Sequence, residues 1–160
     1  EIALFLFNNN HHDFTYYNIV KKNTTSQEWQ LIVKETLQKL NASTHWRKPY
    51  DTIAKVYFEE GQWDKLLATV TEFASFELLA HYEAILNEHF HSQLISLYER
   101  SIRNYLEKNV DRSHYVIACK AIKRLKTITP NHNISYLINE FREKYKRRPA
   151  LIELINKILD

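Results

Sequence analysis

The sequence predicts an all-α fold in which antiparallel pairs of helices stack as a solenoid. Apolar residues recur at steps of three and four most clearly in the middle and C-terminal thirds of the chain, which places them on one face of each helix. One glycine and three prolines among 160 residues leave little material for the tight turns that connect β-strands. The expected helices also come in couples, and the pattern returns after roughly 35 to 45 residues, the period of helix-turn-helix repeats. We therefore expect one helical-repeat domain over residues 1–160.

The order of the expected helices follows from the apolar stripes. They cover residues 2–7, 14–22, 27–40, 46–58, 63–73, 76–88, 92–108, 114–128, 134–145 and 149–159. The first, IALFLF, reads as the tail of a helix whose start lies outside the sequence. A turn and a fresh cap before the stripe at 114–128 are marked by three polar residues, Asn109, Asp111 and Ser113.

Four further residues set the predicted boundaries of these helices. Asp13 is the expected N-cap of the helix over 14–22. Ser26 is the expected N-cap of the next one, with Trp29 at the position where a capping box usually has Glu. Pro130 stops the helix before it, because proline disfavours helical geometry in the preceding residue. Pro149 suits the first turn of the last helix.

Gly61, the one glycine of the sequence, lies between two apolar stripes. It is the expected C-cap of one helix, in the left-handed conformation that other residues resist, and Trp63 begins the antiparallel partner. The surrounding stretch, AKVYFEEGQWDKLLATV, resembles the turn inside a tetratricopeptide repeat, where one aromatic residue precedes a glycine and another follows two residues later. Ala68 and Pro130 correspond loosely to the rest of that pattern. The resemblance implies a tetratricopeptide-like α-solenoid.

The C-terminal segment, LINEFREKYKRRPALIELINKI, is similar to the closing segment of bacterial proteins that carry a SWIM zinc finger near the N-terminus and a long helical region after it. The matching run is Tyr145, Lys146, Arg147, Arg148, Pro149, Ala150 and Leu151. The resemblance extends from about Tyr50 to the end, and the sequence does not contain the zinc motif, Cys-x-Cys followed by Cys-x-His. It implies a helical fragment of a longer protein and supplies no catalytic residues. The lack of any methionine also suggests a fragment.

The residues that often carry catalysis occur here in patterns typical of structural roles. Cys119 lies on an apolar helical stripe, so we expect a small buried side chain and not a nucleophile. Glu59 and Glu60 come just before Gly61, where we expect an exposed helix end with nothing to raise a carboxyl pKa. A single glycine excludes the glycine-rich loops that bind phosphates and dinucleotides. We therefore expect no enzymatic activity.

The eight histidines raise the question of a metal site. Ligands on a helix converge when they lie three or four residues apart. The two groups of neighbouring histidines lack this spacing: His11 with His12, and His89 with His91. His81 lies four residues from Glu77 and His114 four from Val110, but no second ligand joins either. We expect no metal and no other cofactor.

Basic residues form two clusters in the C-terminal half. The first is Lys120, Lys123, Arg124 and Lys126, and the second is Lys144, Lys146, Arg147 and Arg148. If the two met on one surface, they would form a patch that binds phosphates with salt-sensitive affinity. The other interpretation is that the cations favour the C-terminal ends of helices. In particular, Arg147 or Arg148 would hold an acidic group and fix the angle of the last helix; the candidates are Glu140, Glu143 and Glu153.

Stacked helix pairs present extended surfaces that usually bind proteins or peptides. The sequence therefore favours a non-enzymatic module for protein–protein interaction or scaffolding, with a groove between helices as the binding surface. The alternative is a helical module that assists nucleic-acid binding through the two basic clusters. A single cysteine excludes an internal disulfide and suits the cytoplasm. We expect no membrane segment, because IALFLF is too short to span a bilayer and lacks the features of a signal peptide.

Overall fold

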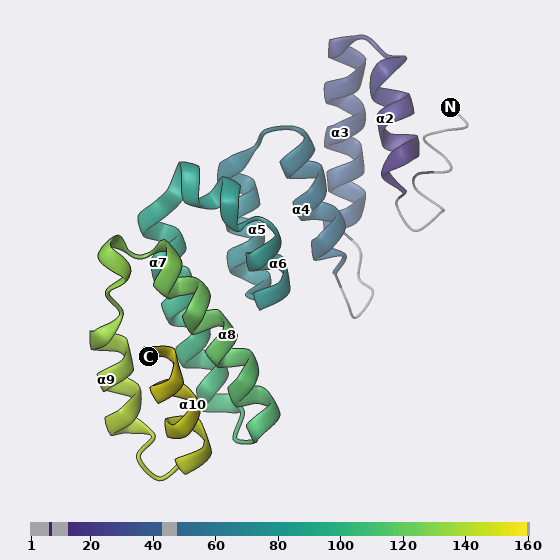
Figure 1. The fold of residues 1–160 in the computed structure, drawn as a ribbon. Helices are drawn as coiled ribbons and strands as arrows, with labels where there is room; N and C mark the ends of the chain where they lie inside the picture. Colours follow the sequence, from purple (N-terminus) through teal and green to yellow (C-terminus); the bar gives the residue numbers. More distant parts are fainter. Residues whose placement is uncertain (1–6, 8–12, 43–47, 160) are drawn as a thin grey trace. The chain divides into compact units, whose positions relative to one another are not determined.

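The computed structural model describes residues 7, 13–42 and 48–159. Nine α-helices and one short 3-10 helix form within these ranges, and no strand occurs there, which confirms the all-α prediction (Figure 1). The chain divides into two compact units, Glu1–Phe73, here the N-terminal unit, and Ala74–Asp160, the C-terminal unit.

The N-terminal unit contains four helices. They are α2 (Phe14–Lys22), α3 (Ser26–Asn41), α4 (Tyr50–Glu59) and α5 (Trp63–Phe73). Residues of α2, α3 and α4 form a core together with Phe7; its members are Phe7, Tyr17, Trp29, Val33, Leu37, Leu40, Ile53 and Val56. The pair α4–α5 is antiparallel: the ring of Tyr50, at the start of α4, stacks on Phe73, at the end of α5, with 4.7 Å between the ring centroids. The hydroxyl of Tyr50 also donates to Glu72, at 2.9 Å.

The start of α2 agrees with its prediction and the start of α3 does not. The side chain of Asp13 caps α2 by accepting a hydrogen bond from the first turn at 2.8 Å. For α3 the predicted cap, Ser26, is wrong by one residue, because Thr25 is the N-cap. Thr25 and Glu28 form a complete capping box, in which the backbone N–H of Thr25 donates to Glu28 at 3.0 Å and that of Glu28 to Thr25 at 3.4 Å. Trp29, one position later, takes no part in the capping box and packs in the core, with 7% of its surface exposed.

Two predictions fall partly outside the described residues. Of the first expected helix only Phe7 is described, and it is helical and buried. Trp46, the expected first residue of another helix, also lies outside them, while α4 begins at Tyr50 with Pro49 as its N-cap.

The turn at Gly61 confirms the predicted left-handed glycine at the end of α4, although the C-cap itself is Glu60, one residue before the predicted position. Gly61 has a φ of +63°, in the left-handed region. The backbone N–H of Gly61 donates to the carbonyl of Phe58 at 3.1 Å, and that of Gln62 to the carbonyl of Tyr57 at 2.9 Å. These two bonds make a Schellman motif, which satisfies carbonyls at the end of the helix. The motif also brings Gln62 next to Tyr57, and α5 begins at Trp63 as predicted.

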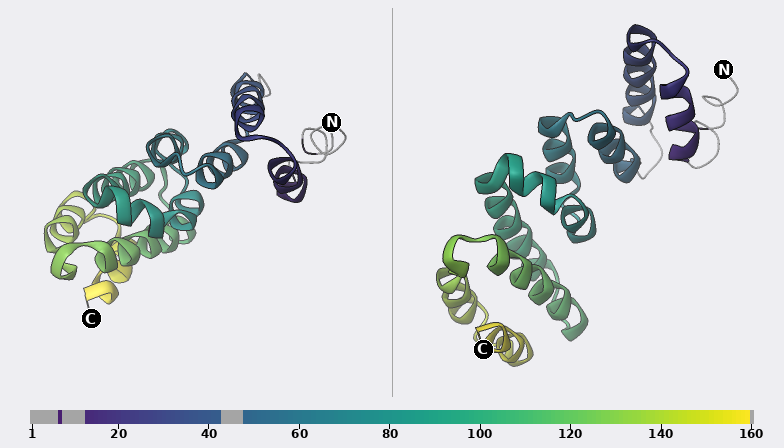
Figure 2. Two further views of the ribbon diagram at one scale, coloured as in Figure 1. Left: turned by 90° about the horizontal axis from the view of Figure 1, so that it is seen from above. Right: turned by 45° about the horizontal axis from the view of Figure 1, so that its top comes forward.

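The C-terminal unit is built around two long antiparallel helices, α7 (Glu83–Lys108) and α8 (Arg112–Ile128), which lie side by side in both figures (Figure 2). The remaining elements are α6 (Phe76–His81), the 3-10 helix (Pro130–His132), α9 (Ser135–Lys144) and α10 (Pro149–Leu159). The core of this unit comes mainly from α7 and α8, with α10 packed against α8. Fully buried side chains there include Leu86, Leu94, Tyr98, Ile102, Leu106, Ile122, Leu125 and Phe141.

Most helix boundaries in this unit agree with the sequence prediction. Asp111, one of the predicted turn residues, caps α8, which begins at Arg112, two residues before the predicted start. The helix ends at Ile128 and α10 begins at Pro149, both as predicted. The exception is the helix predicted over 76–88, which breaks at Tyr82 into α6 and the start of α7. The predicted gap before residue 92 is instead a kink inside α7 at Phe90, which has φ −140° and ψ 43°.

Candidate functional site

Glu60 joins three helices of the N-terminal unit. It is the C-cap of α4, and its carboxylate accepts hydrogen bonds from the hydroxyl of Tyr17 at 2.9 Å, from Nζ of Lys21 at 2.9 Å and from Nε1 of Trp29 at 3.0 Å. Only 14% of the Glu60 side chain is exposed. The prediction of an exposed helix end is therefore wrong for Glu60, because residues of α2 and α3, distant in the sequence, enclose it.

Tyr17 is held in its neutral form at this junction. Burial raises the pKa of the Tyr17 hydroxyl far above its ordinary value, and the negative charge of Glu60 raises this pKa further. A neutral phenol keeps its proton, so Tyr17 donates to Glu60 throughout the neutral range. The ring of Tyr17 packs edge-on against Trp29, with 4.8 Å between the ring centroids.

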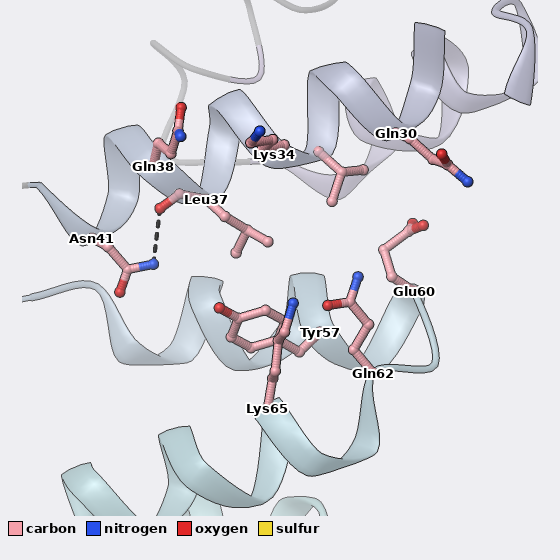
Figure 3. A pocket seen from close by; sticks show the side chains of 10 residues that line it. Gln30, Lys34, Leu37, Gln38, Asn41, Tyr57, Glu60, Gln62 and Lys65 are labelled. Atoms are coloured by element: carbon pink, nitrogen blue, oxygen red, sulfur yellow. Dashed lines mark hydrogen bonds between the residues drawn. The ribbon is translucent and has the colours of Figure 1, made fainter. Parts of the chain in front are cut away.

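A groove of about 550 Å³ lies beside this junction, between α3 and the α4–α5 pair (Figure 3). Its lining residues from α3 are Gln30, Val33, Lys34, Leu37, Gln38 and Asn41. The opposite side is lined by Tyr57, Glu60, Gln62 and Lys65. Figure 3 shows Leu37 pointing down from α3 toward Tyr57, with Gln62 and Lys65 beside the Tyr57 ring. Apolar surface from Val33, Leu37 and Tyr57 makes the floor.

Polar groups without internal partners surround this floor. Lys34 forms no ion pair with any described residue, and the ammonium of Lys65 contacts only a ring face, 5.8 Å from the Tyr57 centroid. The amides of Gln30 and Gln38 make no hydrogen bonds within the described part of the chain. Oε1 of Gln62 is buried and likewise has no hydrogen-bond partner among those residues. The groove thus presents donors and acceptors that the protein itself leaves unused.

The charge of the groove is positive. Glu60 is the only carboxylate among its lining residues, and both of its oxygens accept hydrogen bonds from within the unit. Lys21 forms an ion pair with it at 2.9 Å, which offsets its charge. The two charges that remain at the rim are those of Lys34 on α3 and Lys65 on α5, both exposed to solvent.

The first predicted basic cluster lies along α8. Lys120, Lys123 and Arg124 are exposed, and Arg124 forms a long ion pair with Glu83 at 3.4 Å. Lys126 donates to the carbonyl of Ile158, near the C-terminal end of α10, at 2.8 Å. That contact agrees with the interpretation in which cations favour helix ends.

The second cluster lies at the α9–α10 junction, and its members act mainly within the fold. Lys144 forms an ion pair with Glu107 at 2.5 Å. The guanidinium of Arg148 donates to the backbone carbonyls of Leu106 at 2.6 Å and Asn109 at 3.3 Å, and it lies 4.5 Å from the ring centroid of Tyr145. Lys146 and Arg147 are exposed.

The predicted pairing of Arg148 with an acidic group is wrong. Arg148 caps the C-terminal end of α7 instead, where unpaired carbonyls attract a cation. Two of the three proposed acidic partners pair with other cations: Glu140 with Arg103 at 2.9 Å, and Glu153 with Arg112 at 3.3 Å.

The structure does not bring the two basic clusters together. Arg148 contacts the last turn of α7, which leads directly into the start of α8, whereas Lys126 lies in the last turn of α8. The 14 residues from Arg112 to Lys126 span about 20 Å at 1.5 Å per residue. The second cluster therefore lies near the start of α8, whereas the first occupies the C-terminal half of this helix (Figure 1).

The C-terminal unit has a smaller pocket of about 230 Å³ between α6, α7 and α8. Apolar groups dominate its lining, which comprises Phe76, Glu77, Ala80, Tyr98, Ile117, Lys120, Ala121 and Arg124. Tyr98, one of these lining residues, donates a hydrogen bond to Glu83. Lys120 and Arg124 of the first cluster thus flank an apolar hollow, a relation that the sequence pattern did not predict.

Cys119 has the predicted structural role. It is buried in α8, and burial raises the pKa of its thiol to about 11, so the thiolate is scarce at neutral pH. Within the described ranges no three His, Cys, Asp or Glu side chains cluster as metal ligands; His11 and His12 lie outside those ranges.

Comparison with models of protein families, with curated proteins and with solved structures found no match. None of the helices in the described ranges has the length and apolar character needed to cross a membrane.

Proposed function

We propose that this chain is a non-enzymatic helical-repeat module that binds a segment of another protein in the groove between α3 and the α4–α5 pair. The observation that carries the proposal is an apolar floor, formed by Val33, Leu37 and Tyr57, surrounded by amides and lysines with no internal partner. Binding surfaces combine such apolar area with a few polar groups that fix the orientation of the ligand.

The architecture proposed for the module is a tetratricopeptide-like α-solenoid, within a longer protein that resembles the SWIM zinc-finger group. Antiparallel neighbours with a left-handed glycine at Gly61 support this part of the proposal. Grooves between successive helices are the usual binding surfaces of such repeats.

The chemistry of the groove favours binding over catalysis. Its one carboxylate, Glu60, accepts three internal hydrogen bonds and is not available as a base. The other ionisable groups of the lining are two lysines and Tyr57, and no hydrogen bond joins any two of them; Lys65 approaches the ring face of Tyr57.

Nucleic-acid binding through the basic clusters is the alternative, and the positions of the cations weigh against it. Four of the eight residues make contacts inside the fold: Arg124, Lys126, Lys144 and Arg148. Of the other four, Lys120 and Lys123 lie in the C-terminal half of α8, whereas Lys146 and Arg147 lie at the α9–α10 junction near its start. We expect no salt-sensitive gel shift with single- or double-stranded oligonucleotides. A shift that weakens with added salt and disappears in a Lys120→Ala, Lys123→Ala variant would favour the alternative.

Selection from a displayed library of random dodecapeptides tests the proposed groove. We expect peptides that bind the wild-type chain and lose binding when Gln38→Trp fills the groove from its exposed rim. Lys39→Trp, one residue further along α3 and outside the lining, is the matched control and should keep the binding. Equal binding to both variants would place the surface elsewhere and contradict the proposal.

A further inference from the structure

We infer that the groove between α3 and the α4–α5 pair recognises an extended acidic peptide that carries one apolar side chain between acidic ones. This inference rests on the proposed function and names the chemistry of the partner. Three features of the groove carry it: its charge, its free amides and its length.

The charge selects acidic side chains. Lys34 and Lys65 approach from different helices, α3 and α5, and neither forms an ion pair with a described residue. The only carboxylate of the lining, Glu60, is held by Tyr17, Lys21 and Trp29 and so cannot neutralise them. A peptide with carboxylates on both sides of the floor would pair with both lysines, whereas a basic peptide would be repelled by them.

The amides suit a peptide backbone. A glutamine side chain offers both a donor and an acceptor, the same pair that each backbone unit of an extended peptide requires. Gln30 and Gln38 lie on the α3 side, and Gln62 lies on the opposite side with a buried carbonyl oxygen that has no partner among the described residues. Protein atoms cover this oxygen, so Gln62 would contribute its side-chain N–H₂, which points toward α3 in Figure 3, as a donor to a carbonyl of the bound peptide.

The length and floor of the groove set the size of the recognised segment. From Gln30 to Asn41 the lining follows α3 for 11 residues, or about 16 Å at 1.5 Å per residue. About five residues of an extended chain cover this length at roughly 3.3 Å each. In Figure 3 the side chain of Leu37 lies between Lys34 and Lys65, and together with Val33 and Tyr57, which also line the groove, it offers a place for one apolar side chain.

The dodecapeptide selection, repeated on a charge-reversed chain, tests this inference. On the wild-type chain we expect enrichment of sequences with Asp or Glu on both sides of a large apolar residue. The variant Lys34→Glu, Lys65→Glu should bind these peptides at least about tenfold more weakly by fluorescence anisotropy, since two attractive pairs become repulsive. Lys39→Glu, Lys123→Glu changes the net charge by the same amount at exposed positions outside the groove and should bind as the wild type does.

The outcomes separate the inference from the proposed function. Groove-dependent peptides that are neutral or basic would overturn the acidic partner and leave the binding module standing. Acidic peptides whose affinity falls equally in both charge variants would also overturn it, because net charge and not the groove would then attract them. No enrichment above background would overturn the proposed function itself.

Discussion

The indole N–H of Trp29 donates to Glu60 at 3.0 Å and thereby fastens the first turn of α3 to the end of α4. The same carboxylate holds Tyr17 and Lys21 of α2, so three helices depend on one side chain. The wall of the proposed groove depends on it too, because Glu60 lies at the edge of the groove.

Replacement of Glu60 by alanine should destabilise the chain by about 2 to 3 kcal/mol, since partly buried donors on Tyr17 and Trp29 lose a charged acceptor. Glu60→Gln should cost less, because the amide oxygen still accepts one bond. The measurement is urea unfolding followed by circular dichroism. Glu59→Ala is the control, as the side chain of Glu59 forms no hydrogen bond with a described residue; an equal loss in both variants would contradict the role of Glu60.

Gly61→Ala should lower stability by about 1 kcal/mol, because alanine resists the left-handed conformation. Steric crowding does not add to this loss of stability, because a Cβ at position 61 would lie 3.7 Å from the side chain of Trp63, which is an ordinary van der Waals contact. Gly61→Asn should cost less than Gly61→Ala, since asparagine tolerates this conformation better. Thermal unfolding of the wild type and the two variants ranks their stabilities. An alanine variant as stable as the wild type would be inconsistent with the left-handed φ of Gly61.

Ala74→Gly should stabilise the chain by about 0.5 to 1 kcal/mol. Ala74 has a φ of +52°, which strains an alanine and suits a glycine. The opposite sign is expected for Ala68→Gly at an exposed position inside α5, where glycine costs about 1 kcal/mol relative to alanine. Chemical unfolding of both variants gives the comparison, and a loss of stability on Ala74→Gly would exclude strain at this residue.

Arg148→Ala should destabilise the C-terminal unit by about 1 to 3 kcal/mol, because the carbonyls of Leu106 and Asn109 lose a charged donor. Arg148→Lys should recover part of this, although an ammonium lacks the planar fork that also lies over Tyr145. The adjacent exposed Arg147, changed to alanine, should alter the unfolding midpoint little. If Arg147→Ala were the more damaging variant, the assignment of the cap to Arg148 would be wrong.

Protonation of Asp111 at acidic pH should weaken the N-terminal cap of α8. Its hydrogen bonds with Ser113 and then with the backbone N–H of His114 lower the pKa of the Asp111 carboxyl to about 2. The lowered pKa means that ionised Asp111 contributes stability above its ordinary pKa, and this contribution is lost as the pH falls toward 2. The difference in melting temperature between wild type and Asp111→Asn should therefore shrink between about pH 4 and pH 2. A constant difference across that range would contradict the lowered pKa, which carboxyl NMR titration measures directly.

Local signals in the sequence predicted much of the fold. Asp13, Gly61 and Pro149 each act within one turn of their own position, and the structure places all three as expected. The failure at Ser26 is also local: Thr25 offers the same hydroxyl one residue earlier, with Glu28 in position for the capping box. At Tyr82 the apolar stripe continues through the break, so periodicity alone gave no sign of it.

The candidate site was harder to predict because it depends on contacts between distant parts of the chain. Glu60 meets Tyr17 and Trp29 across 43 and 31 residues, and nothing near Glu60 in the sequence identifies those donors. The contact between Tyr57 and Gln62 could have been predicted from the sequence, because a left-handed glycine at the end of a helix fixes which residues meet around the turn. The Arg148 cap required knowing that the α9–α10 junction lies against the end of α7.

Three neighbouring residues, Glu60, Gly61 and Gln62, have different roles in the structure. Glu60 holds three helices together and Gly61 bends the chain, so folding constrains both residues, while the side-chain nitrogen of Gln62 points into the groove and makes no hydrogen bond with a described residue (Figure 3). Substitutions of Gln62 can therefore change which peptides the groove binds with little loss of folding stability. This turn is thus a suitable position at which to redesign the choice of partner.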